Sequence, residues 1–350
     1  MAEQVRLYAA TRDGVSLLRS TKSGWEQAGL PLPGVTSECF GGGPQHPERV
    51  YVAGERNGLM ATDDAGKHWS TLLEGDMRAV AVDPTNEDVI YAGTEPIHLY
   101  RSEDRGDSWE ELTTLLDFPE DVKFNWWGPQ PPHVGHIANI FIHPDDPRTI
   151  YLCLEHGGVV RSFDRGATWE DVSKGIDYLD MHVLRALPGT PRYFVSSARS
   201  FFTSDDPATG WVPAEEGFTR DYFHDFVFLP PRQEGDNPTM LIATADKSPG
   251  YWDRPERART AFFRSRDCAQ SWERVAHNLP DEIGAWAYAL ANHPSNPRAA
   301  FAGFGDNVRG QERTPTYGQG SIMATYDEGD TWEPLPVEVR STYGLWAAPE

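Results

Sequence analysis

A short motif that ends in tryptophan recurs along the whole chain and constrains the fold more than any other feature of the sequence. Five clear copies read TDDAGKHW, SEDRGDSW, SFDRGATW, SRDCAQSW and TYDEGDTW, and two weaker copies read STKSGW and SDDPATGW. The tryptophans of the seven copies stand at positions 25, 69, 109, 169, 211, 272 and 332. Self-similarity at such a spacing indicates a repeat architecture in which each repeat is one supersecondary unit.

The residues of this motif are those of a tight turn. Asp and Ser or Thr side chains hydrogen-bond to nearby backbone groups, Gly adopts a positive φ, and the Trp ring packs between sheets. The motif therefore predicts a structural role for its aspartates, and we do not expect them to be catalytic. These aspartates are Asp64, Asp104, Asp164, Asp267 and Asp327.

The sequence around each motif predicts four strands per repeat. Residues 136–172 show an apolar strand, a Pro-rich turn, a second and a third strand, the motif turn and a fourth strand. Such a unit is one blade of a β-propeller. We therefore predict an all-β, single-domain, seven-bladed propeller over residues 1–350, closed by pairing the C-terminal strand with the N-terminal blade. The predicted blades are 341–350 with 1–33, 34–75, 76–116, 135–176, 177–219, 220–279 and 280–338.

The motif resembles the Asp-box, and its repetition makes the chain similar to the BNR/Asp-box repeat β-propeller superfamily. That superfamily includes sialidase-like, sortilin-like and photosystem assembly factor-like propellers, as well as xyloglucanase-type glycoside hydrolases. The resemblance implies the fold but leaves the function open, because the superfamily contains both enzymes and binding proteins. Sialidases carry an Arg-Ile-Pro segment that this sequence lacks, and the xyloglucanase type uses two propellers where this sequence accounts for one.

The acidic composition argues against nucleic-acid and membrane partners. A net charge of −22 and a pI near 4.8 repel phosphate backbones and anionic lipid head groups. The chain enters a strand pattern at once and has no apolar run of the roughly 18 residues that a membrane span needs, so we expect a cytoplasmic protein. Its cysteines, Cys39, Cys153 and Cys268, lack the spacing of a disulfide framework or a zinc site.

Three insertions lengthen the repeats and carry aromatic residues. They cover residues 115–135, 246–260 and 306–320. In this topology all three open on one face of the propeller, where long loops on a rigid scaffold often carry binding sites. We therefore expect the rings of Trp126, Trp127 and Trp252 to be exposed on that face and to enclose an organic substrate.

Two registers on the same face place polar residues around the predicted central channel. At the end of the second strand most repeats have a carboxylate, among them Glu55, Glu95, Glu155 and Asp246. Near the start of the first strand, alternate residues share one side and should face the channel. The residues of this second register are Arg78, His136, His182, His224, Trp286, Tyr288 and Tyr343.

The three histidines of the second register predict a divalent-metal site at the mouth of the channel. Three imidazoles with a nearby carboxylate suit Zn, Fe, Cu or Ni and leave a position for water or substrate. Our first hypothesis is a small-molecule enzyme of the hydrolase or lyase type, without an organic cofactor, in which His136, His182 and His224 hold the metal. The candidate catalytic residues are Glu155, Tyr288 and Asp246, and the candidate substrate-binding residues are Arg78, Trp126, Trp127, Trp252, Trp286 and Tyr343.

Two alternatives remain open from the sequence. The chain could be a non-enzymatic propeller that binds a protein or a glycan through its aromatic loops, with the histidines as polar filling of the channel. It could also be a metal-free glycoside hydrolase, which would need two carboxylates about 5 to 10 Å apart.

Overall fold

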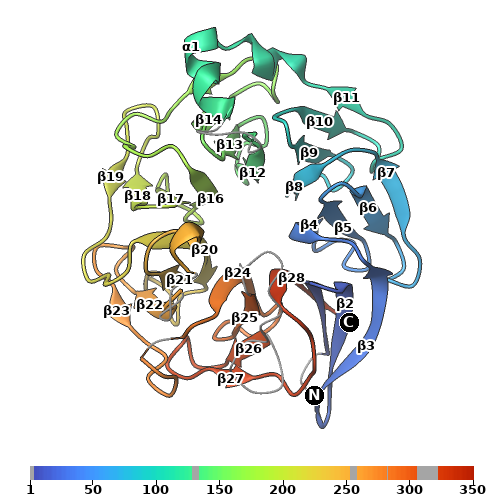
Figure 1. Ribbon diagram of the computed structural model, residues 1–350, viewed down its shortest axis with the longest axis vertical. Coiled ribbons are helices and arrows are strands. Elements are labelled where there is room, and N and C mark those ends of the chain that lie inside the picture. The colour runs from blue at the N-terminus through green and yellow to red at the C-terminus, as the bar shows by residue number, and fades with distance from the viewer. Residues whose placement is uncertain (1–3, 128–133, 253–257, 282, 306–321) are drawn as a thin grey trace. The chain divides into compact units, whose positions relative to one another are not determined.

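The computed structural model describes residues 4–127, 134–252, 258–281, 283–305 and 322–350, and its described part is almost entirely β (Figure 1). The strands form seven four-stranded antiparallel sheets, and in each sheet the strands are neighbours in hairpin order. Each sheet is a propeller blade, so the predicted all-β, seven-bladed propeller is confirmed. No helix in the described ranges is long and apolar enough to cross a membrane.

The chain divides into two compact units, which we describe separately. The first unit comprises residues 1–38, 198–200 and 214–350, and the second comprises residues 39–197 and 201–213. The first unit holds three sheets, and the second holds four apart from the first two residues of β4.

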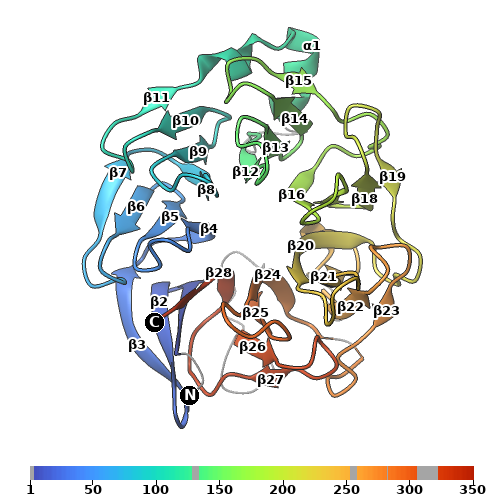
Figure 2. The same cartoon turned by 180° about the vertical axis from the view of Figure 1, so that it is seen from behind.

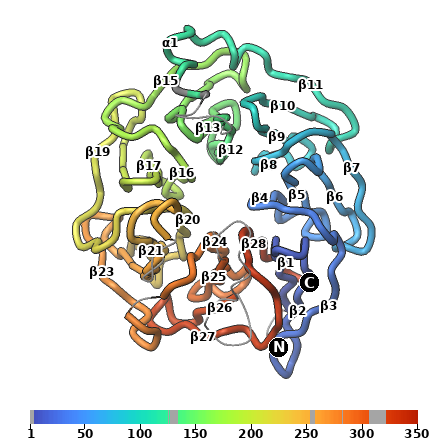
Figure 3. The backbone as a smooth tube through the Cα atoms, viewed as in Figure 1, coloured from blue at the N-terminus to red at the C-terminus, as the bar shows by residue number. Residues whose placement is uncertain are grey.

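In the first unit, one sheet joins the two ends of the chain. Strand β28 pairs antiparallel with β1, from Val5 opposite Pro349 to Thr11 opposite Thr342, which confirms the predicted closure (Figure 3). The strands of this unit are β1 (Val5–Thr11), β2 (Gly14–Thr21), β3 (Gly24–Pro33), β20 (Tyr222–Leu229), β21 (Thr239–Ala245), β22 (Ala261–Ser265), β23 (Glu273–Arg274), β24 (Trp286–Asn292), β25 (Ala300–Gly305), β26 (Ile322–Thr325), β27 (Glu333–Pro334) and β28 (Thr342–Pro349), with a 3₁₀ turn η3 (Pro249–Tyr251).

In the second unit, four sheets follow one another in chain order, and their first strands lie on one side of the unit with their last strands on the other (Figures 1 and 2). The strands are β4 (Ser37–Gly42), β5 (Val50–Gly54), β6 (Gly58–Thr62), β7 (Ser70–Leu73), β8 (Met77–Val82), β9 (Ile90–Thr94), β10 (Leu99–Ser102), β11 (Glu110–Glu111), β12 (Ile137–Ile142), β13 (Ile150–Leu154), β14 (Gly158–Ser162), β15 (Glu170–Asp171), β16 (Met181–Ala186), β17 (Tyr193–Ser197), β18 (Phe201–Ser204) and β19 (Val212–Pro213). An insert of short helices, η1 (Thr113–Asp117), α1 (Glu120–Lys123) and η2 (Phe124–Trp127), connects β11 to β12.

Apolar side chains hold neighbouring sheets together within each unit. In the second unit, Tyr91 and Leu99 of one sheet share a core with Ile137 and Leu152 of the next. In the first unit, Leu241 and Phe262 share a core with residues of the following sheet, and the ring of Phe262 stacks on Trp332 at a centroid distance of 4.5 Å. Second strands such as β13 and β21 are buried along their whole length, so they read as mostly apolar runs.

The aspartates of the tryptophan motif have the predicted structural role. In the copy that ends at Trp109, the Ser102 hydroxyl donates to Asp104 and accepts from the Gly106 amide, whose φ is +96°. Asp104 also accepts from the hydroxyl and amide of Ser108, and these hydrogen bonds lower the pKa of Asp104 to about 2. The oxygens of this carboxylate accept the hydrogen bonds that close the turn, so its role is structural.

Candidate functional site

A β-bulge recurs in the first strand of six sheets and places the residues of the predicted channel register. The register shifts lie between Met77 and Ala79, Ile137 and Asn139, Met181 and Leu184, Phe223 and Phe226, Ala287 and Ala289, and Thr342 and Gly344. A bulge leaves one extra residue outside the ladder and redirects its side chain. Arg78, Tyr288 and Tyr343 are the extra residues of their strands, and His182 and His224 lie within the shift of theirs.

In the second unit, these positions and the adjacent hairpin turns form a charged group that we call the polar cluster. Its members are Glu55, Asp76, Arg78, Glu95, His136, Glu155, His156, Asp180 and His182. Arg78 is the only guanidinium among them, and it pairs with Glu55 at 2.9 Å, with Asp76 at 3.2 Å and with Glu95.

Glu155 connects the histidines of the polar cluster. Nδ1 of His136 lies 2.6 Å from Oε2 of Glu155, and Nε2 of His156 lies 3.6 Å from Oε1. Burial would raise the pKa of the Glu155 carboxyl, but the hydrogen bond with His136 and the positive charge of the surrounding imidazoles outweigh it and lower that pKa to about 2. Glu155 is therefore a carboxylate at any physiological pH.

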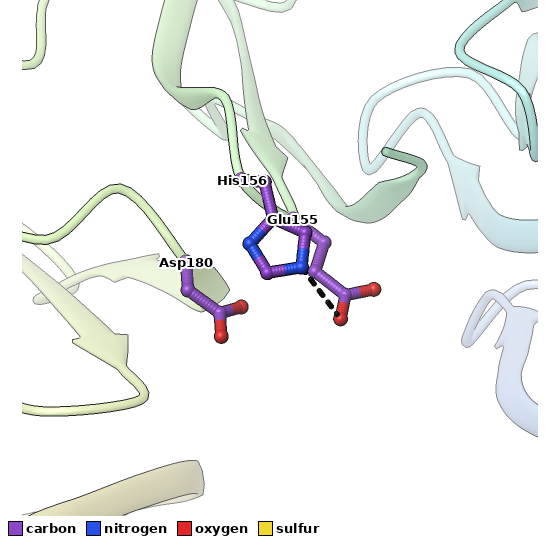
Figure 4. A group of neighbouring side chains, drawn as sticks. All are labelled: Glu155, His156 and Asp180. Atoms are coloured by element: carbon purple, nitrogen blue, oxygen red, sulfur yellow. Dashed lines mark ion pairs between the residues drawn. The ribbon is translucent and has the colours of Figure 1, made fainter. Parts of the chain in front are cut away.

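Three side chains of the polar cluster could hold a metal ion. One oxygen of Glu155, one nitrogen of His156 and one oxygen of Asp180 all lie within 4.8 Å of one another (Figure 4). Glu155 and His156 stand in the turn between β13 and β14, where His156 has a φ of +64° and Gly158 a φ of +80°. Asp180 directly precedes β16, and its Oδ1 lies 3.6 Å from Nε2 of His182.

In the first unit, the corresponding positions form a group of rings that we call the aromatic cluster. It consists of Tyr222, His224, Trp252, Trp286, Tyr288 and Tyr343. Trp286 is at the centre, with ring centroids at 5.3 Å from both Tyr222 and Trp252. Tyr288 and Tyr343 meet edge to face at 5.0 Å, and Gly305 makes room for them because a Cβ there would lie 2.9 Å from the Tyr343 ring.

The predicted three-histidine site is divided between the two clusters. His136 and His182 join the polar cluster, whereas His224 belongs to the aromatic cluster in the first unit, where its Nδ1 lies 2.9 Å from the carbonyl oxygen of Tyr288. Asp246, a predicted catalytic residue, also belongs to the first unit and pairs with Arg259 at 2.8 Å. The structure thus brings two of the three histidines to Glu155 and adds His156 and Asp180.

The expected exposure of Trp126 and Trp252 is wrong. Trp126 and Trp252 are each only 4% exposed, because Trp126 packs into the core beside Phe118 and Trp252 packs against Tyr222 and Trp286. Trp286 is 1% exposed for the same reason. The side chain of Trp127 and the insertion 306–320 lie outside the described residues. Contact of these tryptophans with a substrate stays a prediction.

The sequence reasoning did not single out Asp180 or Asp76 as site residues. A signal was present for Asp180, because it lies two residues before His182 and alternate residues near a strand share one side. Asp76 likewise lies two residues before Arg78. The same alternation that selected the histidine and the arginine would have selected these two carboxylates.

No family model matches this chain. Over 267 residues it is 22% identical to a probable oligoxyloglucan-reducing end-specific xyloglucanase of Neosartorya fischeri, covering 71% of this chain and 28% of that protein. Over 224 residues it is 22% identical to the photosystem II stability/assembly factor HCF136 of Arabidopsis thaliana, covering 57% of this chain and 51% of that protein. The chain therefore spans only about a quarter of the first of these curated relatives and about half of the second.

Solved structures show the same fold. A GH74 xyloglucanase from Xanthomonas campestris matches with a TM-score of 0.64 and 19% identity, covering 99% of this chain and 52% of that one. YCF48 bound to a D1 peptide matches with a TM-score of 0.55 and 18% identity, covering 86% of this chain and 81% of that one. At this level of identity the likeness concerns the propeller alone, and both a hydrolase and a binding protein are found among its neighbours.

Proposed function

We propose that this protein is a small-molecule enzyme of the hydrolase or lyase type, with a divalent metal held by Glu155, His156 and Asp180. The observation that supports the proposal is the convergence of their ligand atoms within 4.8 Å. One imidazole and two carboxylates form a donor set that suits Zn and other first-row divalent ions and leaves positions for water or substrate. A metal there would lower the pKa of a bound water or polarise a carbonyl group.

Two of the predicted histidine ligands take a different role in this proposal. His136 donates to Oε2 of Glu155, and His182 lies beside Oδ1 of Asp180. Groups that hydrogen-bond to metal-ligating carboxylates fix their orientation and are part of a working site. His136 would thus orient Glu155, and His156 would supply the imidazole ligand, with His182 close to Asp180.

The partners of the carboxylates support the choice of Glu155 as a metal ligand. Glu55 and Glu95 are paired with Arg78, and Asp246 is paired with Arg259, so each of these carboxylates faces a permanent positive charge. Glu155 has no guanidinium partner among the ion pairs of the described residues and faces imidazoles instead, which can themselves be metal ligands.

The charge of the polar cluster favours a neutral or cationic substrate. Its carboxylates, Glu55, Asp76, Glu95, Glu155 and Asp180, outnumber the single guanidinium of Arg78 by four charges when the histidines are neutral. A divalent ion would neutralise only half of that excess. Substrates with phosphate or carboxylate groups would be repelled, and esters, amides, glycosides or amines would not.

A binding function is the second candidate. It is supported by the match to YCF48 bound to a peptide, in which this chain covers 81% of the other chain, far more than it covers of the xyloglucanases. A metal-free glycoside hydrolase is a further candidate, in which Glu155 would be the ionised carboxylate and Asp180 would have to supply the acid.

Zn²⁺ and Ni²⁺ binding tests the metal proposal. We expect protein loaded with either ion and then desalted to retain about one equivalent by elemental analysis, and a hundredfold excess over Kd to stabilise the fold by about 2.7 kcal/mol. His156→Ala and Asp180→Asn should each lose the retained metal and the stabilisation.

The matched control is His98→Ala. His98 also pairs with a glutamate, Glu111, at 2.7 Å, but it lies outside the polar cluster. Metal retention by His98→Ala at the wild-type level supports the proposal. The proposal fails if the wild-type protein retains no stoichiometric metal or if the control loses it equally. Failure with both ions, together with stabilisation by a peptide or an oligosaccharide, would favour the binding function.

A further inference from the structure

The indole of Trp126 lies directly against the turn that carries Glu155 and His156. A Cβ added to Gly157 of that turn would lie 2.9 Å from Cδ1 of Trp126 and 2.6 Å from Cβ of Leu154, so the ring and the turn backbone are in close contact. Only glycine fits between them. A ring wedged here limits where the backbone of the turn can go.

Trp126 is also hydrogen-bonded to the segment that carries His136, directly before β12. The amide of Gly135 donates to the carbonyl oxygen of Trp126 at 2.7 Å, and the amide of Glu155 donates to the carbonyl oxygen of His136 at 3.0 Å. A Cβ at Gly135 would lie 2.1 Å from the carbonyl oxygen of Trp126 and 2.9 Å from that of Glu155. The backbones of the insert, of the start of β12 and of the Glu155 turn therefore touch at one point.

The described part of the insert, residues 113–127, also packs on the ring. Phe118 meets Trp126 edge to face at 5.5 Å, and Leu115 is fully buried in the same core. Lys123 donates to the carbonyl oxygen of Leu116 at 3.0 Å, which closes the insert on itself. The insert thus forms a small packed unit, and its residue Trp126 makes the contact with the turn that carries Glu155 and His156.

The turn that Trp126 contacts contains a non-glycine residue in the left-handed conformation. His156 has a φ of +64°, a conformation that costs a non-glycine residue free energy and persists only when its surroundings hold it. One ligand atom each of Glu155, His156 and Asp180 lie within 4.8 Å of one another, and Asp180 directly precedes β16 of the next sheet, so a small movement of the turn would separate them (Figure 4).

We propose that Trp126 is a positioning residue, which holds the Glu155 and His156 turn so that its ligand atoms converge with Asp180. The inference rests on the proposed metal function. It gives the insert a different task from the one that its aromatic sequence predicts, since the ring supports the site from within the core. Among the described residues, Nε1 of Trp126 has no hydrogen-bond partner, so the contribution of this side chain is contact by the ring.

The test compares Co²⁺ binding by Trp126→Ala and Trp126→Phe. Losses of supporting residues around a metal site commonly weaken metal affinity 10-fold to 100-fold. We expect Trp126→Ala to weaken Co²⁺ binding by about 10-fold or more and to alter the visible absorption spectrum of bound Co²⁺. Trp126→Phe keeps a ring and removes no hydrogen bond, so it should restore affinity to within about threefold of wild type, a residual cost of less than 1 kcal/mol.

Trp332 offers a matched control. It is 1% exposed, its ring stacks on Phe262, and its Nε1 also has no partner within the described ranges. Trp332→Ala should lower the melting temperature as much as Trp126→Ala does and leave Co²⁺ affinity unchanged. Trp126→Leu replaces Trp126→Ala in this comparison if the alanine variant does not fold.

Four results would overturn the inference. The first is a folded Trp126→Ala or Trp126→Leu variant with wild-type affinity and spectrum, and the second is an equal loss of affinity in Trp332→Ala. The third is failure of Trp126→Phe to restore binding, and the fourth is failure of both truncated variants to fold. Absence of Co²⁺ binding by the wild-type protein would instead contradict the proposed function. The two failures are therefore distinguishable.

Discussion

The polar cluster and the aromatic cluster occupy corresponding places in their sheets and have opposite character. Both are built on the first strands, at the positions where the bulges redirect side chains. In the second unit these positions carry Arg78 and His182, which pair with carboxylates. In the first unit they carry Tyr288 and Tyr343, which pack against each other.

This difference assigns ligand binding to the polar cluster and structural stabilisation to the aromatic cluster. His136 and His224 come from the same sequence register, yet His136 contacts a carboxylate whereas His224 contacts a backbone carbonyl and two rings. A carboxylate can bind a metal ion, whereas buried rings contribute packing. We therefore expect metal binding in the polar cluster, and a contribution to stability in the aromatic cluster.

Trp286→Ala should have the largest effect on stability. Truncation of a ring that is 1% exposed removes its contacts with Tyr222 and Trp252 and leaves a cavity, which should cost about 3 to 5 kcal/mol of the free energy of unfolding. Urea denaturation followed by circular dichroism measures this loss, and Zn²⁺ retention should persist in the folded variant. A cost below about 1 kcal/mol, or loss of metal, would contradict a purely supporting aromatic cluster.

Glu155→Gln should have an intermediate effect that depends on pH. The lowered pKa of Glu155 stabilises the fold above the unfolded-state value of about 4.3, and this stabilisation is lost as the pH falls toward about 2. Since a third of the side chain is exposed, we expect a cost of about 1 to 2 kcal/mol at pH 6. Unfolding curves of both proteins should converge between about pH 4.3 and pH 2.

The control for this pH dependence is Glu111→Gln, which removes a similar glutamate from the more exposed pair with His98. We expect this substitution to change the free energy of unfolding by less than about 0.5 kcal/mol across the same range. A Glu155→Gln cost that does not shrink on acidification would show that the carboxylate contributes by packing alone.

The smallest effect concerns a type of hydrogen bond that is found in each unit and joins the first strands of adjacent sheets. Asn139 accepts from the amide of Leu184 at 3.0 Å in the second unit, and Asp225 accepts from the amide of Leu290 at 2.8 Å in the first, each joining adjacent sheets. Asn139→Ala should cost about 1 kcal/mol and Asp225→Ala about 1.5 kcal/mol, because a charged acceptor binds more strongly. Amide hydrogen exchange at Leu184 and Leu290 measures this, and unchanged protection would contradict it.

The fold was predictable because its signal repeats. Any one tryptophan motif is a weak indication, but the copies ending at Trp109 and Trp169 share the same hydrogen bonds in the structure, as identical local chemistry requires. Closure by β28 and β1 was also predictable, since the sequence begins at a second strand and ends with a first.

The site was predictable only in part, because it depends on contacts between different sheets. Strand alternation led to His136, His182 and Arg78, but the left-handed turn at His156 and its approach to Asp180 come from the packing of successive blades. The burial of Trp126 could not be deduced from its loop, because an aromatic insertion looks the same in sequence whether it covers a core or meets a ligand.

The recurrent bulge has a consequence for how such a protein can change. Its extra residue takes no part in strand pairing, so arginine at position 78, histidine at 182 and tyrosine at 343 are tolerated by the same backbone. Substitutions at these positions would change the chemistry of the two clusters and leave the ladder bonds intact. The propeller therefore has one position in each bulged strand at which different side chains fit the same backbone. Substitutions in successive blades could change the specificity of such a protein step by step.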